Sequence, residues 1–331
     1  MHGRIETLRF ESRCLRGNKL GDPHERDVHV YLPPGYDDDT RRYPTVMMLP
    51  GFGSTHRSML SFSPWEPNPV ERFDRLVSAG SSPAAILVLP DAMNRWGGSQ
   101  YLDSPATGPY QTYLADEVVP RVDGAFRTVA ERAGRAVVGK SSGGFGALRL
   151  VMDRPDLFAA AGSHAGDALF EVSMRPLLTT AAIAIERAGG VAAFAERVVE
   201  GGPRSGPEFE AVFVLACAAA YSPEPRSGPP HCALPFDPVT AELLPDVWER
   251  WLAHDPVRRI ADAGDALAPM ELLYLDAGDR DEHGLHFAAR VLRDGLRRAG
   301  TPVHHEEFEG GHRRTGWRYG VSLPQLIGKL A

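Results

Sequence analysis

The most constraining stretch of this sequence is residues 134–152, which reads as a strand, a sharp turn and a helix. An apolar, β-branched run leads to Gly139, Ser141 stands at the apex, and Gly143 follows. Glycines lack a Cβ, so they let a strand and a helix approach closely and let the serine between them adopt a strained backbone. This G-x-S-x-G pattern predicts that Ser141 is presented at the end of a buried strand.

The same letters also match G-x-x-x-x-G-K-S, the phosphate-binding P-loop, from Gly134 to Ser141. In a P-loop, the four residues between the glycines form the turn around the phosphate, and a hydrophobic strand comes before them. Here these four residues contain two valines and resemble the strand itself, while residues 128–133 do not form a hydrophobic strand. The strand–turn–helix interpretation is therefore favoured over a P-loop NTPase, in which Lys140 would bind phosphate, and over a glycine-rich turn without chemistry.

Strands and helices alternate along most of the chain, which predicts an α/β fold with a mostly parallel sheet and helices on both faces. Two segments that alternate apolar and polar residues, 5–10 and 27–31, predict antiparallel strands at a sheet edge. Later strands are expected at residues 43–49, 84–89, 137–139, 158–163, 270–276 and 302–308, and helices at 69–79, 113–122, 286–299 and 319–330. Parallel sheets bind ligands beyond the carboxyl ends of their strands. We therefore expect the glycine loop at 51–53, Asp91, Ser141 and His164 to meet in one crevice.

The pattern changes between residues 167 and 255, where apolar helices are expected at 174–188, 209–221 and 247–252. We therefore predict a core formed by residues 1–166 and 256–331, with residues 167–255 as a helical insertion, or cap, over the strand ends. The alternative is an ordinary packing appendage.

Composition narrows the classes of partner. The 331 residues carry a formal charge of −7 and no clustered basic stripe, which argues against a nucleic-acid partner. We expect no signal peptide and no membrane partner, because the first residues are polar and no run of 18 apolar residues occurs. The three cysteines, Cys14, Cys217 and Cys232, are scattered, which suits a reducing compartment without disulfides, so we expect a cytoplasmic location.

A serine hydroxyl needs a general base, and the base needs an orienting carboxylate. In chains with this elbow the order is serine, acid, histidine. His312 follows the last expected strand and two glycines, so it is the candidate base. Asp276, Asp279 and Asp281 all lie around the preceding strand end. Asp281 is preferred because the carboxylate must reach away from the strand tip, and the other two stay open.

Two backbone N–H groups should form an oxyanion hole: that of Ser142, after the nucleophile, and that of Phe52, after the first central strand. His283 and His286 are three residues apart, a spacing that metals use, but no further ligand set is evident, so we expect no metal and no cofactor.

Several spaced blocks of this sequence resemble the family of α/β-hydrolases known as putative esterases, which includes esterase D, enterochelin esterases, feruloyl esterases and mycolyltransferases. The blocks are residues 30–36, 43–53, 89–91, 101–105 with Gly108, 139–147, 154–158, 278–281 and 310–312. The resemblance implies the α/β-hydrolase fold and a triad of Ser141, Asp281 and His312, since the G-x-x-D pattern of the family falls on Asp281. The chain departs from the family where Pro50 replaces the usual histidine that opens the oxyanion loop, and in the length of the insertion.

We therefore expect a serine hydrolase that cleaves a small-molecule carboxylic ester through an acyl-enzyme. Trp96, His164 and Asp167 are candidate pocket residues by position alone. Acyl transfer to an acceptor other than water, and a binding protein without catalysis on the same fold, are the alternatives. A feruloyl ester, a siderophore lactone, a sugar acetate and a thioester would all suit this chemistry.

Overall fold

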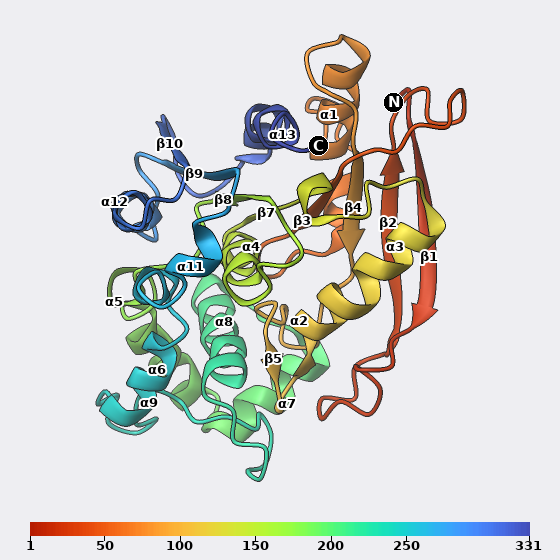
Figure 1. Cartoon of the computed structure of the whole chain (residues 1–331). Helices are drawn as coiled ribbons and strands as arrows, with labels where there is room; N and C mark the ends of the chain where they lie inside the picture. Colours follow the sequence, from red (N-terminus) through yellow and green to blue (C-terminus); the bar gives the residue numbers. More distant parts are fainter.

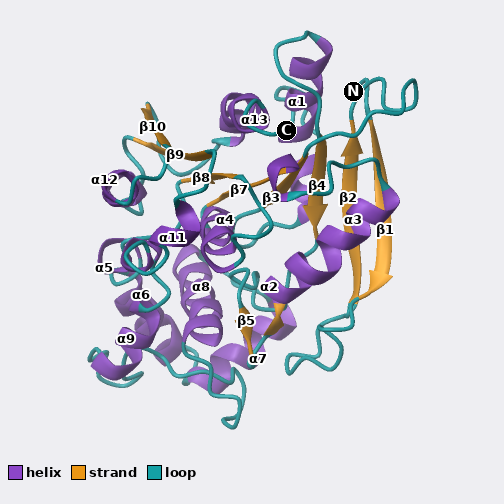
Figure 2. Ribbon diagram, viewed as in Figure 1, coloured by secondary structure: helices purple, strands orange, loops and turns teal.

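The computed structural model describes residues 1–331 and is organised around an eight-stranded sheet with helices on both faces (Figures 1 and 2). The strand order is β1-β2-β4-β3-β7-β8-β9-β10. Strand β2 is antiparallel to both of its neighbours, and the other pairs are parallel. The predicted α/β class, with a mostly parallel sheet and an antiparallel edge, is confirmed. The strands of this sheet are β1 (Arg4–Glu11), β2 (Glu25–Leu32), β3 (Thr45–Leu49), β4 (Ile86–Pro90), β7 (Arg135–Lys140), β8 (Ala160–His164), β9 (Leu272–Gly278) and β10 (Val303–Phe308).

The central strands are apolar on both faces because helices cover both. Along β3, Met47 and Leu49 point into one core, while Val46 and Met48 point into the other. Helices α1 and α13 cover the second face, and α3, α4 and α12 cover the first. These helices are α1 (Pro69–Ser78), α3 (Val119–Ala125), α4 (Ser142–Asp153), α12 (Leu285–Arg298) and α13 (Tyr319–Ile327).

Short elements complete the core. A 3₁₀ turn, η1 (His56–Leu60), follows β3, and a two-stranded ribbon joins β5 (Asp103–Ser104) to β6 (Gly108–Pro109). The helix expected at residues 113–122 is α2 (Tyr110–Thr112), a π-helical turn η2 (Tyr113–Val118) and α3 in succession. The remaining short elements are η3 (Arg132–Gly134), α10 (Pro256–Arg259), α11 (Gly264–Leu267) and η4 (Gly316–Arg318).

Residues 167–255 form five helices below the sheet in Figure 1. These helices pack around one hydrophobic cluster, to which residues outside the segment also contribute: Leu20, Trp96, Leu102, Ala106 and Phe145. They are α5 (Phe170–Ser173), α6 (Leu177–Arg187), α7 (Val191–Gly201), α8 (Gly206–Tyr221) and α9 (Pro245–Leu252). The apolar pattern of the sequence predicts no helix where α7 lies. Gly189 and Gly190, with φ of 90° and 106°, separate α7 from α6, and glycine accommodates this backbone without strain.

No single helix is both long and apolar enough to cross a membrane; α6 and α7 reach that length and composition only together, across a bend of 87°. The three cysteines are unpaired, and Cys217 is buried within α8.

Candidate active site

Ser141 lies in the turn between β7 and α4 with φ of 55° and ψ of −125°, a conformation that residues with side chains rarely adopt. The neighbouring glycines permit this turn. A Cβ on Gly139 would lie 2.2 Å from the carbonyl oxygen of Gly143, and one on Gly143 would lie 2.0 Å from that of Leu49. Such strain costs about 1–3 kcal/mol and persists only where the packing imposes it. Because residues 135–140 are a strand, no phosphate-cradling turn follows Gly134.

His312, in the loop after β10, lies between Ser141 and Asp281. Its Nε2 is 3.1 Å from Ser141 Oγ, and its Nδ1 is 2.8 Å from Asp281 Oδ2. A carboxylate can only accept a hydrogen bond. Nδ1–H of His312 therefore donates to Asp281, and Nε2 is free to accept the hydroxyl proton of Ser141.

Asp281 is held as an ionised carboxylate. Its side chain is fully buried, and its Oδ1 accepts hydrogen bonds from the backbone N–H groups of His283 (3.0 Å) and Leu285 (3.4 Å). Burial alone would raise the pKa of Asp281, but the hydrogen bond and charge of His312, together with these N–H groups, outweigh burial and lower that pKa. Of the other two aspartates considered, Asp279 accepts from the backbone N–H of Gly310, and Asp276 belongs to a separate network.

That separate network contains His164, which does not line the site. His164 Nδ1 lies 2.7 Å from Asp276 Oδ1, and His164 Nε2 lies 3.0 Å from Ser322 Oγ on α13. Arg318 Nε donates to Asp276 Oδ2 at 2.6 Å. Burial would raise the pKa of Asp276, but His164 and Arg318 outweigh it and lower that pKa. His164 serves the elbow only through its backbone, because its carbonyl accepts the N–H of Ser141 at 2.9 Å.

The loop after β3 brings the predicted oxyanion donors beside Ser141. A Cβ on Gly51 would lie 3.2 Å from the carbonyl oxygen of Lys140 and 3.3 Å from Ser141 Cβ, so the loop packs against the elbow. The backbone N–H groups of Phe52 and Ser142 donate to no backbone acceptor within the protein. Both donors are therefore available to an oxygen atom of a ligand.

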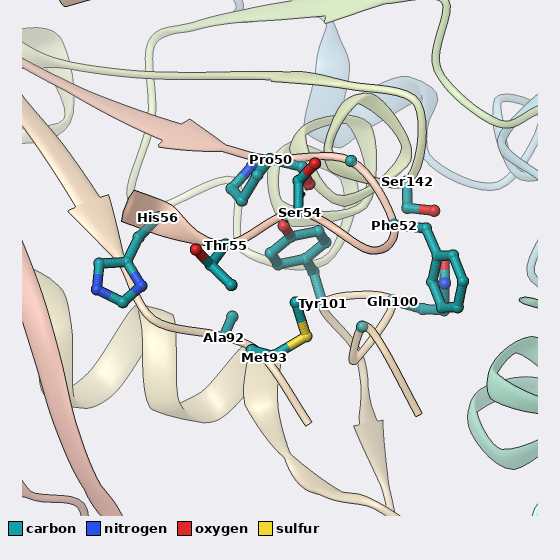
Figure 3. Close-up of a pocket in the computed structure, with 12 residues that line it drawn as sticks. Pro50, Phe52, Ser54, Thr55, His56, Ala92, Met93, Gln100, Tyr101 and Ser142 are labelled. Atoms are coloured by element: carbon teal, nitrogen blue, oxygen red, sulfur yellow. Dashed lines mark hydrogen bonds between the residues drawn. The ribbon is translucent and has the colours of Figure 1, made fainter. Parts of the chain in front are cut away.

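Tyr101 anchors this loop from beneath, as Figure 3 shows, and sequence reasoning assigns it no role. Its hydroxyl donates to the carbonyl oxygen of Pro50 at 2.5 Å. Its ring packs on the elbow helix, since a Cβ on Gly146 would lie 2.5 Å from that ring. Gln100 and Tyr101 both have positive φ, of 53° and 56°. No sequence pattern marks this contact, because it joins a loop to a loop 51 residues away.

The insertion also contacts the oxyanion loop. The ring of Phe52 packs against Phe209 and Phe213 of α8, with centroids 5.3 Å and 5.0 Å apart. On its other side, a Cβ on Gly97 would lie 3.0 Å from the Phe52 ring. Phe52 is therefore held between a glycine turn of the core and a helix of the insertion.

A cavity of about 590 Å³ opens above Ser141 and His312. The core contributes residues such as Phe52 to its wall, and the insertion contributes Asp167, Met174, Leu177, Phe209, Glu210 and Phe213. Trp96 lies elsewhere: it lines a separate cavity of about 460 Å³ beside α7, because the 94–98 turn directs its ring toward Leu20 and Ala195. Of the three pocket residues suggested by position, Asp167 borders the cavity above Ser141, and Trp96 and His164 do not.

The carboxyl group of Asp167 is almost completely buried, with 4% of the residue exposed, and its Oδ2 accepts a hydrogen bond from Ser142 Oγ at 2.9 Å. Burial raises the pKa of Asp167 to about 6; the hydrogen bond from Ser142 and the nearby His312 offset part of this effect.

Comparison with known proteins places the chain in a family. Residues 23–327 match the family described as "Putative esterase". The chain is 32% identical over 170 residues to Esterase Rv1288 of Mycobacterium tuberculosis, covering 50% of this chain and 33% of that protein. It is 25% identical over 169 residues to an endo-1,4-beta-xylanase/feruloyl esterase of Xylanibacter ruminicola, covering 50% of this chain and 22% of that protein. The matched regions thus span a third or less of these curated relatives.

Solved structures share the whole architecture. A ferulic acid esterase superposes with a TM-score of 0.63 at 20% identity, covering 99% of this chain and 98% of that one. An S-formylglutathione hydrolase from Agrobacterium tumefaciens superposes with a TM-score of 0.58 at 14% identity, covering 100% and 96%. At such identities the likeness establishes the fold, and the match over residues 23–327 establishes the family. The chain has the α/β-hydrolase fold and belongs to the "Putative esterase" family.

Proposed function

We propose that this protein is a serine hydrolase that cleaves carboxylic esters through Ser141, His312 and Asp281. The observation that carries the proposal is the continuous hydrogen-bonded series from Asp281 through His312 to Ser141, at the wall of an open cavity. Membership of an esterase family supports the same reaction.

In the first half-reaction, Ser141 Oγ attacks the ester carbonyl carbon while His312 Nε2 takes its proton. The carbonyl oxygen becomes an oxyanion that accepts hydrogen bonds from the N–H groups of Phe52 and Ser142. The C–O bond to the alcohol then breaks, His312 returns the proton to the leaving alcohol, and the acyl group stays on Ser141.

In the second half-reaction, His312 takes a proton from water, and the resulting nucleophile attacks the acyl carbon. The acid leaves, and Ser141 regains its proton. Throughout both halves, the ionised Asp281 fixes the imidazole orientation and stabilises its positive charge.

The test compares two serines. Ser141→Ala should lower kcat for p-nitrophenyl acyl esters by several orders of magnitude, to roughly 10³–10⁴-fold above the uncatalysed rate. Ser322→Ala is the matched control, because Ser322 makes the same contact with a histidine–aspartate pair but is fully buried. This control should keep wild-type kcat.

The panel should span short acyl chains and, because one relative is named a feruloyl esterase, methyl ferulate. A fluorophosphonate probe should label the wild type and not Ser141→Ala. An inactive wild type that also resists the probe would favour a binding protein, and equal rates for wild type and Ser141→Ala would refute the assigned nucleophile. Formation of a new ester in the presence of an added alcohol, without release of free acid, would favour acyl transfer.

A further inference from the structure

Asp167 has a buried carboxyl group beside the nucleophile, and only one of its two oxygens has a well-formed hydrogen bond within the protein. Oδ2 accepts a hydrogen bond from Ser142 Oγ, whereas Oδ1 has no hydrogen bond of ordinary length and angle; the Ser141 side chain also lies near the carboxyl group and helps to lower its pKa. Asp167 borders the cavity that Ser141 and His312 also line, so its carboxyl group lies at the wall of the space that a ligand would occupy. A buried carboxylate with one partner is costly, and it is stabilised when a further donor reaches it.

The chain around Asp167 is held in an unusual conformation. Ala165, two residues before Asp167, and Leu169, two residues after it, have φ of 43° and 52°, values that non-glycine residues rarely adopt. Between them, a Cβ on Gly166 would lie 2.1 Å from Ser163 Oγ. Strain of this kind concentrates at ligand-binding sites, where the surrounding packing maintains it. Here it holds the backbone of the loop that carries Asp167.

The charges of the cavity indicate what kind of donor would fit. Lys140 and Arg313 line the same cavity as Asp167 and Glu210, so positive and negative side chains are balanced. A substrate ammonium near Ser141 would meet the charge of Lys140, next to it in the chain. A neutral hydroxyl donates to the carboxylate without that repulsion.

We propose, on the basis of the function proposed above, that Asp167 is a specificity-determining residue that accepts a hydrogen bond from a hydroxyl group close to the ester carbonyl of the substrate. The substrate class is accordingly hydroxyl-bearing esters rather than plain alkyl esters. A hydrogen bond to a charged group gives a preference of about tenfold to a hundredfold.

The test uses matched pairs of esters in which a hydroxyl replaces a hydrogen atom or a methyl group. Ethyl 2-hydroxybutyrate and ethyl 3-hydroxybutyrate are each compared with ethyl butyrate, and 2-hydroxyethyl butyrate with propyl butyrate. Acid release gives kcat/KM, and each ratio is divided by the ratio of the alkaline hydrolysis rates. The wild type should prefer at least one hydroxy ester about tenfold or more.

Asp167→Ala should bring that ratio close to one, and Asp167→Asn, which keeps the shape and can still accept from Ser142, should reduce it. Because a ratio is measured, general damage to the fold cancels. Glu210→Gln is the matched control: it removes the other carboxylate of the cavity and should leave the ratio unchanged.

Three results would overturn this inference while leaving the proposed function intact. They are hydrolysis of plain esters without preference in any pair, equal losses on both members of a pair in Asp167→Ala, and loss of the preference in Glu210→Gln as well. By contrast, failure of the wild type to cleave any of these esters, or to react with the fluorophosphonate probe, would contradict the proposed function itself.

Discussion

Asp167 should make the stability of this protein fall as the pH rises, which is the opposite of the effect of carboxylates whose partners lower their pKa, such as Asp276 and Asp281. Replacing it with asparagine removes the titration but keeps the size of the side chain and the hydrogen bond from Ser142. We therefore predict that Asp167→Asn gains stability relative to the wild type as the pH rises from 4 to 8.

The magnitude follows from the environment of Asp167. Burial raises its pKa from 3.8 to about 6, and each unit of difference corresponds to 1.36 kcal/mol. The folded state therefore binds the proton more tightly than the unfolded state does. Stability falls as the pH rises from 3.8 through 6, and the deficit above this window is about 3 kcal/mol. Asparagine has no such deficit.

Several groups that titrate or carry charge face Asp167. His312 and Asp281 lie on the site side, and Cys217 and Tyr221 face it from α8. All four are present in both the wild type and Asp167→Asn. The difference between the two proteins therefore isolates the titration of Asp167.

Urea unfolding monitored by tryptophan fluorescence at pH 4, 5, 6, 7 and 8 measures this difference. Asp237→Asn is the control, because backbone N–H groups of Thr240 and Val239 lower the pKa of this exposed carboxylate. Its contribution is complete above about pH 5 and is lost as the pH falls through 3.8, so the control should show a constant difference from wild type between pH 5 and pH 8. A constant difference for Asp167→Asn as well would refute the desolvation argument.

Two further predictions concern Tyr101, which supports the oxyanion loop, and Asp276, which lies in the buried network around His164. Tyr101→Phe removes the hydroxyl that supports Pro50, and we expect kcat to fall at least tenfold with little change in KM. The fall should not exceed the roughly 10²–10³-fold loss that follows removal of a whole oxyanion donor. Steady-state kinetics measure this effect, and an unchanged kcat would contradict a supporting role for Tyr101. Asp276→Asn removes the buried carboxylate that Arg318 and His164 contact, and we expect the free energy of unfolding to fall by about 3–5 kcal/mol. A change below about 1 kcal/mol in urea unfolding would contradict a stabilising role for this network.

Local sequence predicts the elbow well because each of its parts is local. A β-branched run, closely packed glycines and an apolar helix all fall within residues 135–153, and the structure has the strand and helix there. The meeting of Ser141 with His312, 171 residues later, could also be expected. In a parallel sheet the carboxyl ends of the strands lie at one edge, so chain order and strand ends suffice to bring the two loops together.

The direction of individual side chains at strand ends and in loops could not be predicted from the sequence. His164 ends a strand beside the elbow, as expected, but side chains alternate along a strand, and this one points to the α13 face of the sheet, where Ser322 and Tyr319 lie. Trp96 points away from the cavity above Ser141, and its direction depends on the conformation of the loop that carries it. The support of Pro50 by Tyr101 joins two irregular loops, and no periodicity encodes such a contact.

The buried series Ser322–His164–Asp276 has a consequence for recognising enzymes by shape. Its serine–histidine and histidine–aspartate distances, 3.0 Å and 2.7 Å, are as short as those around Ser141. A search for three side chains in this arrangement would therefore find two centres in one molecule. Ser322 lies within a regular helix and has no exposed surface, whereas Ser141 has a positive φ and borders a cavity. A reliable template would thus describe the backbone of the serine and its access to solvent along with the three side chains.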